Sequence, residues 1–181
     1  MVKRTETGKV SFGARHINDF IQWFTVILVV VFSVGMCFAK TIPEFERMTS
    51  LVGEWKGASV DGKPATVTYT LVSDNSALME RLAMGGESDM VTMYHPDGDH
   101  LMMTHYCSAH NQPRMRSQTV AVGSKNITFD LVDVTNLSGP DAGHMKKLVV
   151  TFEDKDHFVQ EWTWREKGRE GTVVVHFERI K

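Results

Sequence analysis

Ten short runs rich in Val, Thr, Tyr, Phe and Trp follow one another between Glu54 and Ile180, with turn residues about every ten positions. Gly, Pro, Asn and Asp gather between the runs, as in Asp61–Pro64 and Pro96–Asp99. Short strands joined by short turns pair as antiparallel neighbours, because parallel strands need a long crossover connection. The pattern therefore predicts an all-β domain. The expected strands are Glu54–Val60, Ala65–Val72, Ala77–Met84, Asp89–His95, His100–Cys107, Pro113–Val122, Lys125–Val134, His144–Phe152, His157–Arg165 and Thr172–Ile180.

Apolar and polar residues alternate within these runs, most regularly late in the chain. Leu148, Val150 and Phe152 share one face of their strand, and Val175 and Phe177 share one face of another. A strand with one apolar and one polar face belongs to a sheet that is wet on one side. Closing such a sheet leaves no open edge, so we expect an antiparallel up-and-down β-barrel of about eight to ten strands. A two-sheet sandwich is the competing architecture.

Residues 1–39 differ from the rest of the chain and are expected to form a membrane-targeting segment. Four lysines and arginines precede Phe20–Ala39, an apolar stretch about as long as the roughly 20 residues that cross a bilayer as a helix. The small residues Cys37 and Ala39 fit a signal-peptidase site. The long basic leader fits an uncleaved anchor instead, and lipidation of Cys37 is a further alternative.

Either form of export places residues 40–181, the expected barrel domain, in the periplasm or outside the cell. If Cys37 leaves with the leader, Cys107 is the only cysteine left, and no intramolecular disulfide can form. A short helix is expected over Pro43–Leu51, where a proline stands first and apolar residues follow at helical spacing.

Charge and motifs narrow the range of partners. The formal net charge of −2 gives no basic field of the kind that nucleic-acid-binding proteins use. The sequence contains no phosphate-binding glycine loop, no dinucleotide fingerprint and no His-Glu-x-x-His zinc motif. We expect no nucleic-acid partner and no cofactor, and membrane contact only through residues 1–39 if they stay attached.

The two ends of the expected barrel carry a recognisable arrangement. Gly53-Glu54-Trp55 opens the first strand directly after the short helix, and Arg179 lies two positions after Phe177 in the last strand. This arrangement resembles the calycins, the superfamily of lipocalins and fatty-acid-binding proteins, in which a basic residue of the last strand covers the tryptophan. The resemblance implies structural roles for Gly53, Trp55 and Arg179. An indole can close a barrel end, and a guanidinium can stack on its face.

Two further segments, Thr104–Cys107 and Asn111–Met115, resemble an uncharacterised group of bacterial lipocalin-like proteins, which implies a fold but no activity. The chain also has about the size of haem-binding nitrobindin-like barrels. It departs from their glycine-rich first strand, since Lys56–Ser59 follows Trp55.

Three consecutive strands, Met90–His95, His100–Cys107 and Pro113–Val120, hold most methionines of the barrel domain, its one certain thiol and two closely spaced arginines, and we expect them to line a ligand site. Methionines are flexible and suit adaptable apolar pockets, while a few polar groups hold the polar end of a ligand. The candidate ligand-binding residues are Glu80, Met93, Met103, His105, Tyr106, Cys107 and Arg114.

The register of these strands decides which of the candidates point inwards. His105 is the first polar contact if it faces the core, and Tyr106 and Arg114 take its place if the register is shifted by one residue. Arg114 and Arg116 would clamp a ligand carboxylate inside the barrel, or lie on a solvated outer face. Glu80 alternates with apolar residues and is expected inside, with Arg114 or His105 as its partner.

Binding of a small apolar or amphipathic molecule inside the barrel is the function that we expect, and an enzymatic role is not favoured. A metal- or haem-dependent protein is the first alternative. It would use His105 and Cys107, two apart on one strand, with His110 or His95 as a third ligand. A packed structural domain without a ligand is the second alternative.

Overall fold

The computed structural model describes residues 42–86, 88–121 and 123–181. The leader expected over residues 1–39 and the domain boundary after it lie outside this part of the chain. Within the described residues, no helix has the length and apolar character needed to span a bilayer. The elements are α2 (Pro43–Thr49), β1 (Gly53–Ser59), β2 (Pro64–Val72), β3 (Ala77–Met84), β4 (Met90–Asp97), β5 (His100–Tyr106), β6 (Gln112–Ser117), β7 (Asn126–Thr135), β8 (His144–Phe152), β9 (His157–Glu166) and β10 (Arg169–Arg179).

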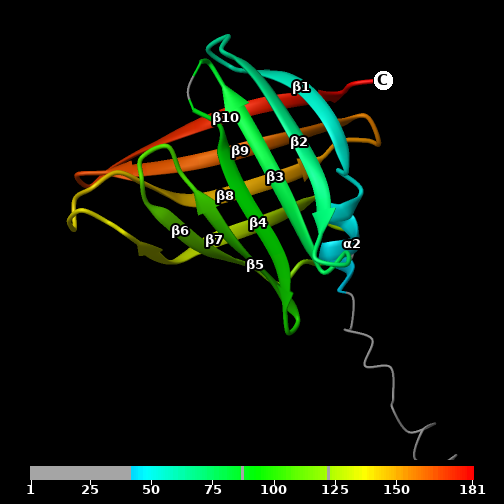
Figure 1. Cartoon of the computed structure of the whole chain (residues 1–181), viewed down its shortest axis with the longest axis horizontal. Helices are drawn as coiled ribbons and strands as arrows, with labels where there is room; N and C mark the ends of the chain where they lie inside the picture. Colours follow the sequence, from blue (N-terminus) through cyan, green and yellow to red (C-terminus); the bar gives the residue numbers. More distant parts are fainter. Residues whose placement is uncertain (1–41, 87, 122) are drawn as a thin grey trace, which may run out of the picture. The chain divides into compact units, whose positions relative to one another are not determined.

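The ten strands form a closed antiparallel barrel in which each strand pairs with its neighbours along the chain (Figure 1). The last strand, β10, pairs with β1, so the described sheet has no open edge. Inward residues such as Val67 and Tyr69 on β2 are buried, and the threonines that alternate with them are more exposed. The all-β, antiparallel, up-and-down barrel expected from the alternating runs is confirmed, and the two-sheet sandwich is wrong.

Two strand boundaries differ from those expected by more than two residues. β6 ends at Ser117, well before Val122, because its last pair with β5 is Met102–Arg116 and its last pair with β7 is Ser117–Phe129. β10 begins at Arg169, because only Lys167 and Gly168 form the turn before it. Both have positive φ angles, 49° and 74°, as in the two-residue turns that match the twist of a hairpin.

Trp55 and Arg179 close the barrel where its first and last strands meet, as their positions in the sequence predict. They are paired residues of β1 and β10. Trp55 is 1% exposed, and the guanidinium carbon of Arg179 lies 4.0 Å from its ring centroid. The Trp55 indole donates a hydrogen bond to the Leu51 carbonyl, and Arg179 donates to the carbonyls of Val52 and Ser50. One cation–π contact and three hydrogen bonds thus join β1, β10 and the short segment that follows α2.

Gly53 is required by this closure. Its φ angle is +126°, a conformation that other residues rarely adopt. A Cβ atom at this position would also lie 3.0 Å from Nη1 of Arg179.

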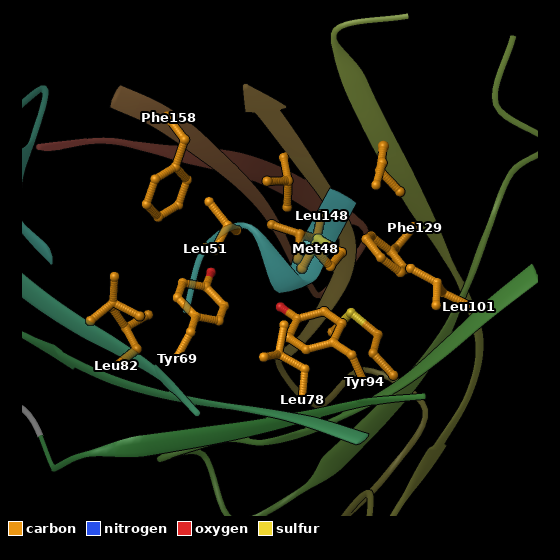
Figure 2. Close-up of a cluster of buried hydrophobic side chains, with 14 of the residues drawn as sticks. Met48, Leu51, Tyr69, Leu78, Leu82, Tyr94, Leu101, Phe129, Leu148 and Phe158 are labelled. Atoms are coloured by element: carbon orange, nitrogen blue, oxygen red, sulfur yellow. The ribbon is translucent and has the colours of Figure 1, made fainter. Parts of the chain in front are cut away.

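The short helix α2 covers this end of the barrel. Phe45 and Met48 of α2 are buried in the core. Figure 2 shows Met48 in one cluster with residues from several strands, among them Tyr94 and Leu148. Arg47 donates to the Ser124 carbonyl in the β6–β7 loop and lies over the ring of Phe152. The hairpin loops β1–β2, β3–β4, β5–β6, β7–β8 and β9–β10 gather at the opposite end. We call that end, which no described helix covers, the open end.

We predict that Trp55→Ala lowers the free energy of unfolding by about 3–5 kcal/mol, because it leaves a cavity where the barrel closes. Lys56→Ala, on the outward face of the same strand, is the control and should change stability by no more than about 0.5 kcal/mol. Denaturant titration of both variants measures the difference. Equal stability of the two would show that the Trp55 end does not hold the barrel closed.

Candidate functional site

A buried polar cluster lies inside the barrel among apolar side chains. Its members are the Glu80 network, defined as Tyr69, Glu80, Thr92, Tyr94 and Gln160, and the imidazole of His105. Each of these residues is at most 1% exposed. No lysine or arginine is buried among the described residues. The interior therefore holds one ionisable carboxyl group without a cationic partner.

Glu80 is held by donors from three strands. The hydroxyls of Tyr69 and Tyr94 donate to its Oε2 atom at 2.7 and 2.8 Å. Figure 2 shows both hydroxyls directed into the barrel. The amide of Gln160 donates to the same oxygen at 2.9 Å. Thr92 Oγ1 lies 3.4 Å from the other carboxyl oxygen, Oε1. These hydrogen bonds replace the water that Glu80 loses on burial.

The orientation of the Gln160 amide follows from its second neighbour. The indole of Trp162 can only donate, so it identifies the atom 3.0 Å away as the oxygen of Gln160. The amide nitrogen therefore faces Glu80 and the Tyr69 hydroxyl.

Burial has the largest effect on the pKa values of these groups. Desolvation raises the pKa of Glu80, and its four hydrogen bonds act in the opposite direction. Desolvation, reinforced by the nearby carboxyl group, raises the pKa values of Tyr69 and Tyr94 well above the usual range. The two hydroxyls are consequently protonated, and able to donate, at neutral pH.

His105 extends the network towards the open end. Its Nδ1 atom shares a hydrogen bond of 2.9 Å with Thr92 Oγ1, and its ring centroid lies 4.7 Å from that of Trp162. Desolvation lowers the pKa of His105 to about 4, so the imidazole is neutral at neutral pH. Its second nitrogen, Nε2, is buried and has no hydrogen-bond partner among the residues that the structure describes.

A pocket of about 440 Å³ opens among the loops of the open end. We call it the open-end pocket. Its wall is mainly apolar, and Asp61 and Lys63 of the β1–β2 turn add charged groups. The side chains that line it include Met84, Met90, Cys107, Met145, Trp164 and Val173.

Strand alternation places this pocket directly above His105. Cys107 follows His105 by two residues, and Trp164 follows Trp162 by two residues, on the same inward faces. Met90 precedes Thr92 by two residues in the same way. His105 and Trp162, which do not themselves line the pocket, therefore lie one layer beneath its wall, and we call their ring contact the floor. The Glu80 network lies below this floor.

The structure divides the predicted ligand-binding residues into two groups. Glu80, Met103 and His105 are buried inside the barrel, and Cys107 lines the open-end pocket.

Tyr106, Arg114 and Met93 were candidates for the interior, and this assignment is wrong. Tyr106 and Arg114 are exposed, Met93 is half-buried, and all three alternate with buried residues on their strands. They therefore lie on the outer face of the barrel. The register in which His105 faces inwards is the one observed.

The expected role of arginine inside the barrel is also wrong. Arg114 forms a two-pronged salt bridge with Asp133 of the neighbouring strand, and Arg116 lies near Asp97. Neither arginine reaches Glu80, whose partners are the two tyrosines, Gln160 and Thr92. His105 contacts Glu80 only through Thr92.

The residues of the metal alternative do not come together. His110 is exposed in the β5–β6 loop, and His95 is exposed and contacts the Pro96 carbonyl. Among residues 42–86, 88–121 and 123–181, no group of three or more His, Cys, Asp or Glu residues is placed to hold a metal ion.

Sequence reasoning missed Tyr69, Tyr94 and Gln160 as partners of Glu80. Gln160 carries the clearest signal in the sequence, because it is a polar residue between Phe158 and Trp162 on an apolar face. A polar residue in such a position needs a buried partner.

Comparisons with known proteins give little further information. No family model matches the chain, and no curated protein matches it. The chain is similar to the crystal structure of a protein of unknown function from the DUF3598 family of Nostoc punctiforme, with 14% sequence identity and a TM-score of 0.43. The match covers 74% of this chain and 49% of that one, so the chain spans about half the length of that protein.

We predict that Glu80→Met destabilises the barrel by about 3–5 kcal/mol, because it leaves the buried hydroxyls of Tyr69 and Tyr94 without an acceptor and removes one partner of the Gln160 amide. Glu80→Gln should cost clearly less, since its amide oxygen can still accept from Tyr69, Tyr94 and Gln160. Denaturant titration at neutral pH separates the two variants. Equal losses would mean that side-chain volume, rather than hydrogen bonding, decides stability here.

A second prediction concerns pH. Because the pKa of His105 is about 4 in the folded protein and about 6.5 when unfolded, the unfolded chain binds more protons between these values. Stability is therefore lost as the pH falls through this window, by about 3 kcal/mol near pH 4.

The variant His105→Phe lacks this contribution, while Glu80 keeps its other partners. Its unfolding free energy should fall by about 3 kcal/mol less than that of the parent between about pH 7 and pH 4. Urea titrations across this range measure the difference. Parallel pH profiles of the two proteins would contradict the low pKa of His105.

Proposed function

We propose that this protein is an exported, calycin-like carrier or sensor that binds a small apolar or amphipathic molecule in the open-end pocket. The observation that carries the proposal is the pocket itself. It lies in a closed barrel, and its volume of about 440 Å³ falls within the roughly 300–1,000 Å³ range of small-molecule sites.

The composition of the pocket wall indicates the kind of ligand. Met84, Met90 and Met145 provide flexible apolar contacts, and Trp164 provides a flat aromatic one. The centre of the barrel is filled by buried side chains such as Tyr94, Met103 and Phe129. A ligand therefore occupies the space above the floor of His105 and Trp162, rather than the whole interior.

Two features support the calycin-like assignment and the export. The Gly53–Trp55 and Arg179 arrangement that resembles the calycins lies where the barrel closes. The basic, apolar leader of residues 1–39 carries the proposal of export to the periplasm or beyond, either cleaved or as an anchor.

We predict that the full-length protein binds the neutral fluorescent probe N-phenylnaphthylamine and that Gly171→Phe weakens this binding by about tenfold or more, equal to about 1.4 kcal/mol. Gly171 lines the pocket, and a Cβ atom added to it meets no atom within 4 Å. The new ring should therefore occupy ligand space without disturbing the barrel. Fluorescence titration measures the affinity.

Gly139→Phe is the matched control, because it adds the same ring at a glycine that does not line the pocket. A Cβ atom added at Gly139 likewise meets no atom within 4 Å. It should bind the probe as the parent does. Equal weakening by both substitutions would place the site elsewhere. No binding to the parent would favour the packed structural domain.

A further inference from the structure

The Nε2 atom of His105 is an unused polar group in the layer beneath the wall of the open-end pocket. It is buried and has no hydrogen-bond partner among the described residues. The opposite edge of the ring is fixed, since Nδ1 bonds to Thr92 and the ring packs on Trp162. The imidazole therefore cannot turn to find another partner without losing both contacts.

In neither neutral form of the imidazole does Nε2 have a hydrogen-bond partner among the described residues. If Nδ1 carries the proton and donates to Thr92, Nε2 is an acceptor without a donor. If Thr92 donates to Nδ1, Nε2 carries a proton and has no acceptor. A buried polar atom without a partner destabilises a fold, so Nε2 is expected to have one in the functional state.

The location of His105 leaves the pocket as the source of that partner. Three strands, β6, β7 and β8, separate β5 from β9 along the shorter way around the barrel. The contact between His105 and Trp162 therefore crosses the interior. Below it lies the Glu80 network, which is internally satisfied, and above it lies the pocket lined by Cys107 and Trp164.

The charges of the interior limit the chemistry of the ligand. No lysine or arginine is buried in the described part of the chain, so an anionic group at the floor would have no cationic partner. Glu80 is linked to His105 through Thr92 and would repel such an anion when ionised. A cation would lose its hydration shell on burial and would gain only one neutral nitrogen as a partner. An uncharged polar group satisfies these conditions.

We propose that Nε2 of His105 binds the hydroxyl group of an uncharged, otherwise apolar ligand, such as an alkylated phenol or an alcohol, in the open-end pocket. A hydroxyl both donates and accepts, so it pairs with either form of the imidazole. The flexible side chains of Met90 and Met145 can move to let the hydroxyl reach the floor. This inference names the ligand class of the proposed function and rests on it.

The test compares three ligands of nearly the same shape in displacing N-phenylnaphthylamine from the full-length protein. They are butylphenol, butyltoluene and butylbenzoic acid, which carry a hydroxyl, a methyl and a carboxyl group at the same ring position. At about pH 8 only the acid is ionised. Butylphenol should bind roughly three- to tenfold tighter than butyltoluene, the range expected for one neutral hydrogen bond. The carboxylate should bind most weakly.

Two variants identify the contact. His105→Phe keeps an aromatic ring against Trp162 but removes the nitrogen, so butylphenol should lose its advantage while butyltoluene binds as before. Tyr106→Phe, on the outward face of the same strand, removes a hydroxyl elsewhere and should leave the ligand ranking unchanged. If His105→Phe does not fold, the ranking in the parent protein decides.

The possible failures are distinguishable. If the probe and butyltoluene bind but butylphenol shows no advantage, or the carboxylate binds tightest, the role of His105 is refuted and the apolar pocket stands. If His105→Phe retains the preference for butylphenol, another residue binds the hydroxyl and the inference is wrong. If no probe binds the parent, the proposed function and this inference fall together.

Discussion

The pairing of β1 with β10 is the contact on which the interior of this protein depends. It turns ten antiparallel strands into a closed wall, and the stacking of Arg179 on Trp55 fastens it next to α2. Without this pairing, both strands would present open edges, and the polar groups inside would meet water. Because α2 covers one end of the barrel, only hairpin loops surround the opposite end, and the pocket lies at that end.

Closure has an energetic consequence for the polar residues within. Glu80 lies in an interior without a buried cation, and the fold surrounds it with Tyr69, Tyr94 and Gln160 instead. These neutral donors form hydrogen bonds to the carboxyl group and fill the space around it. The network therefore forms a buried, hydrogen-bonded layer beneath the pocket that the methionines and Trp164 line. A filled layer below and flexible apolar contacts above are an arrangement suited to holding a small apolar molecule.

The alternation of residues within each strand was enough to predict the barrel, because burial on one face imposes a period of two. Glu80 and His105 could be placed inside by the same rule, with the register of His105 left open. Tyr106 and Arg114 belong to the register that the structure excludes. The partners of Glu80 could not be predicted, since Tyr69 and Gln160 are 91 positions apart in the chain and only barrel closure brings them together.

The central claim is that the open-end pocket receives an apolar ligand, and methionine methyl resonances report this most directly. In the full-length protein with isotope-labelled methionine methyl groups, butylphenol should shift the signals of Met84, Met90 and Met145, which line the pocket. The signals of Met79 and Met93, which face outwards on β3 and β4, should not move. Shifts confined to the outward methionines, or no shifts at saturating ligand, would contradict the account.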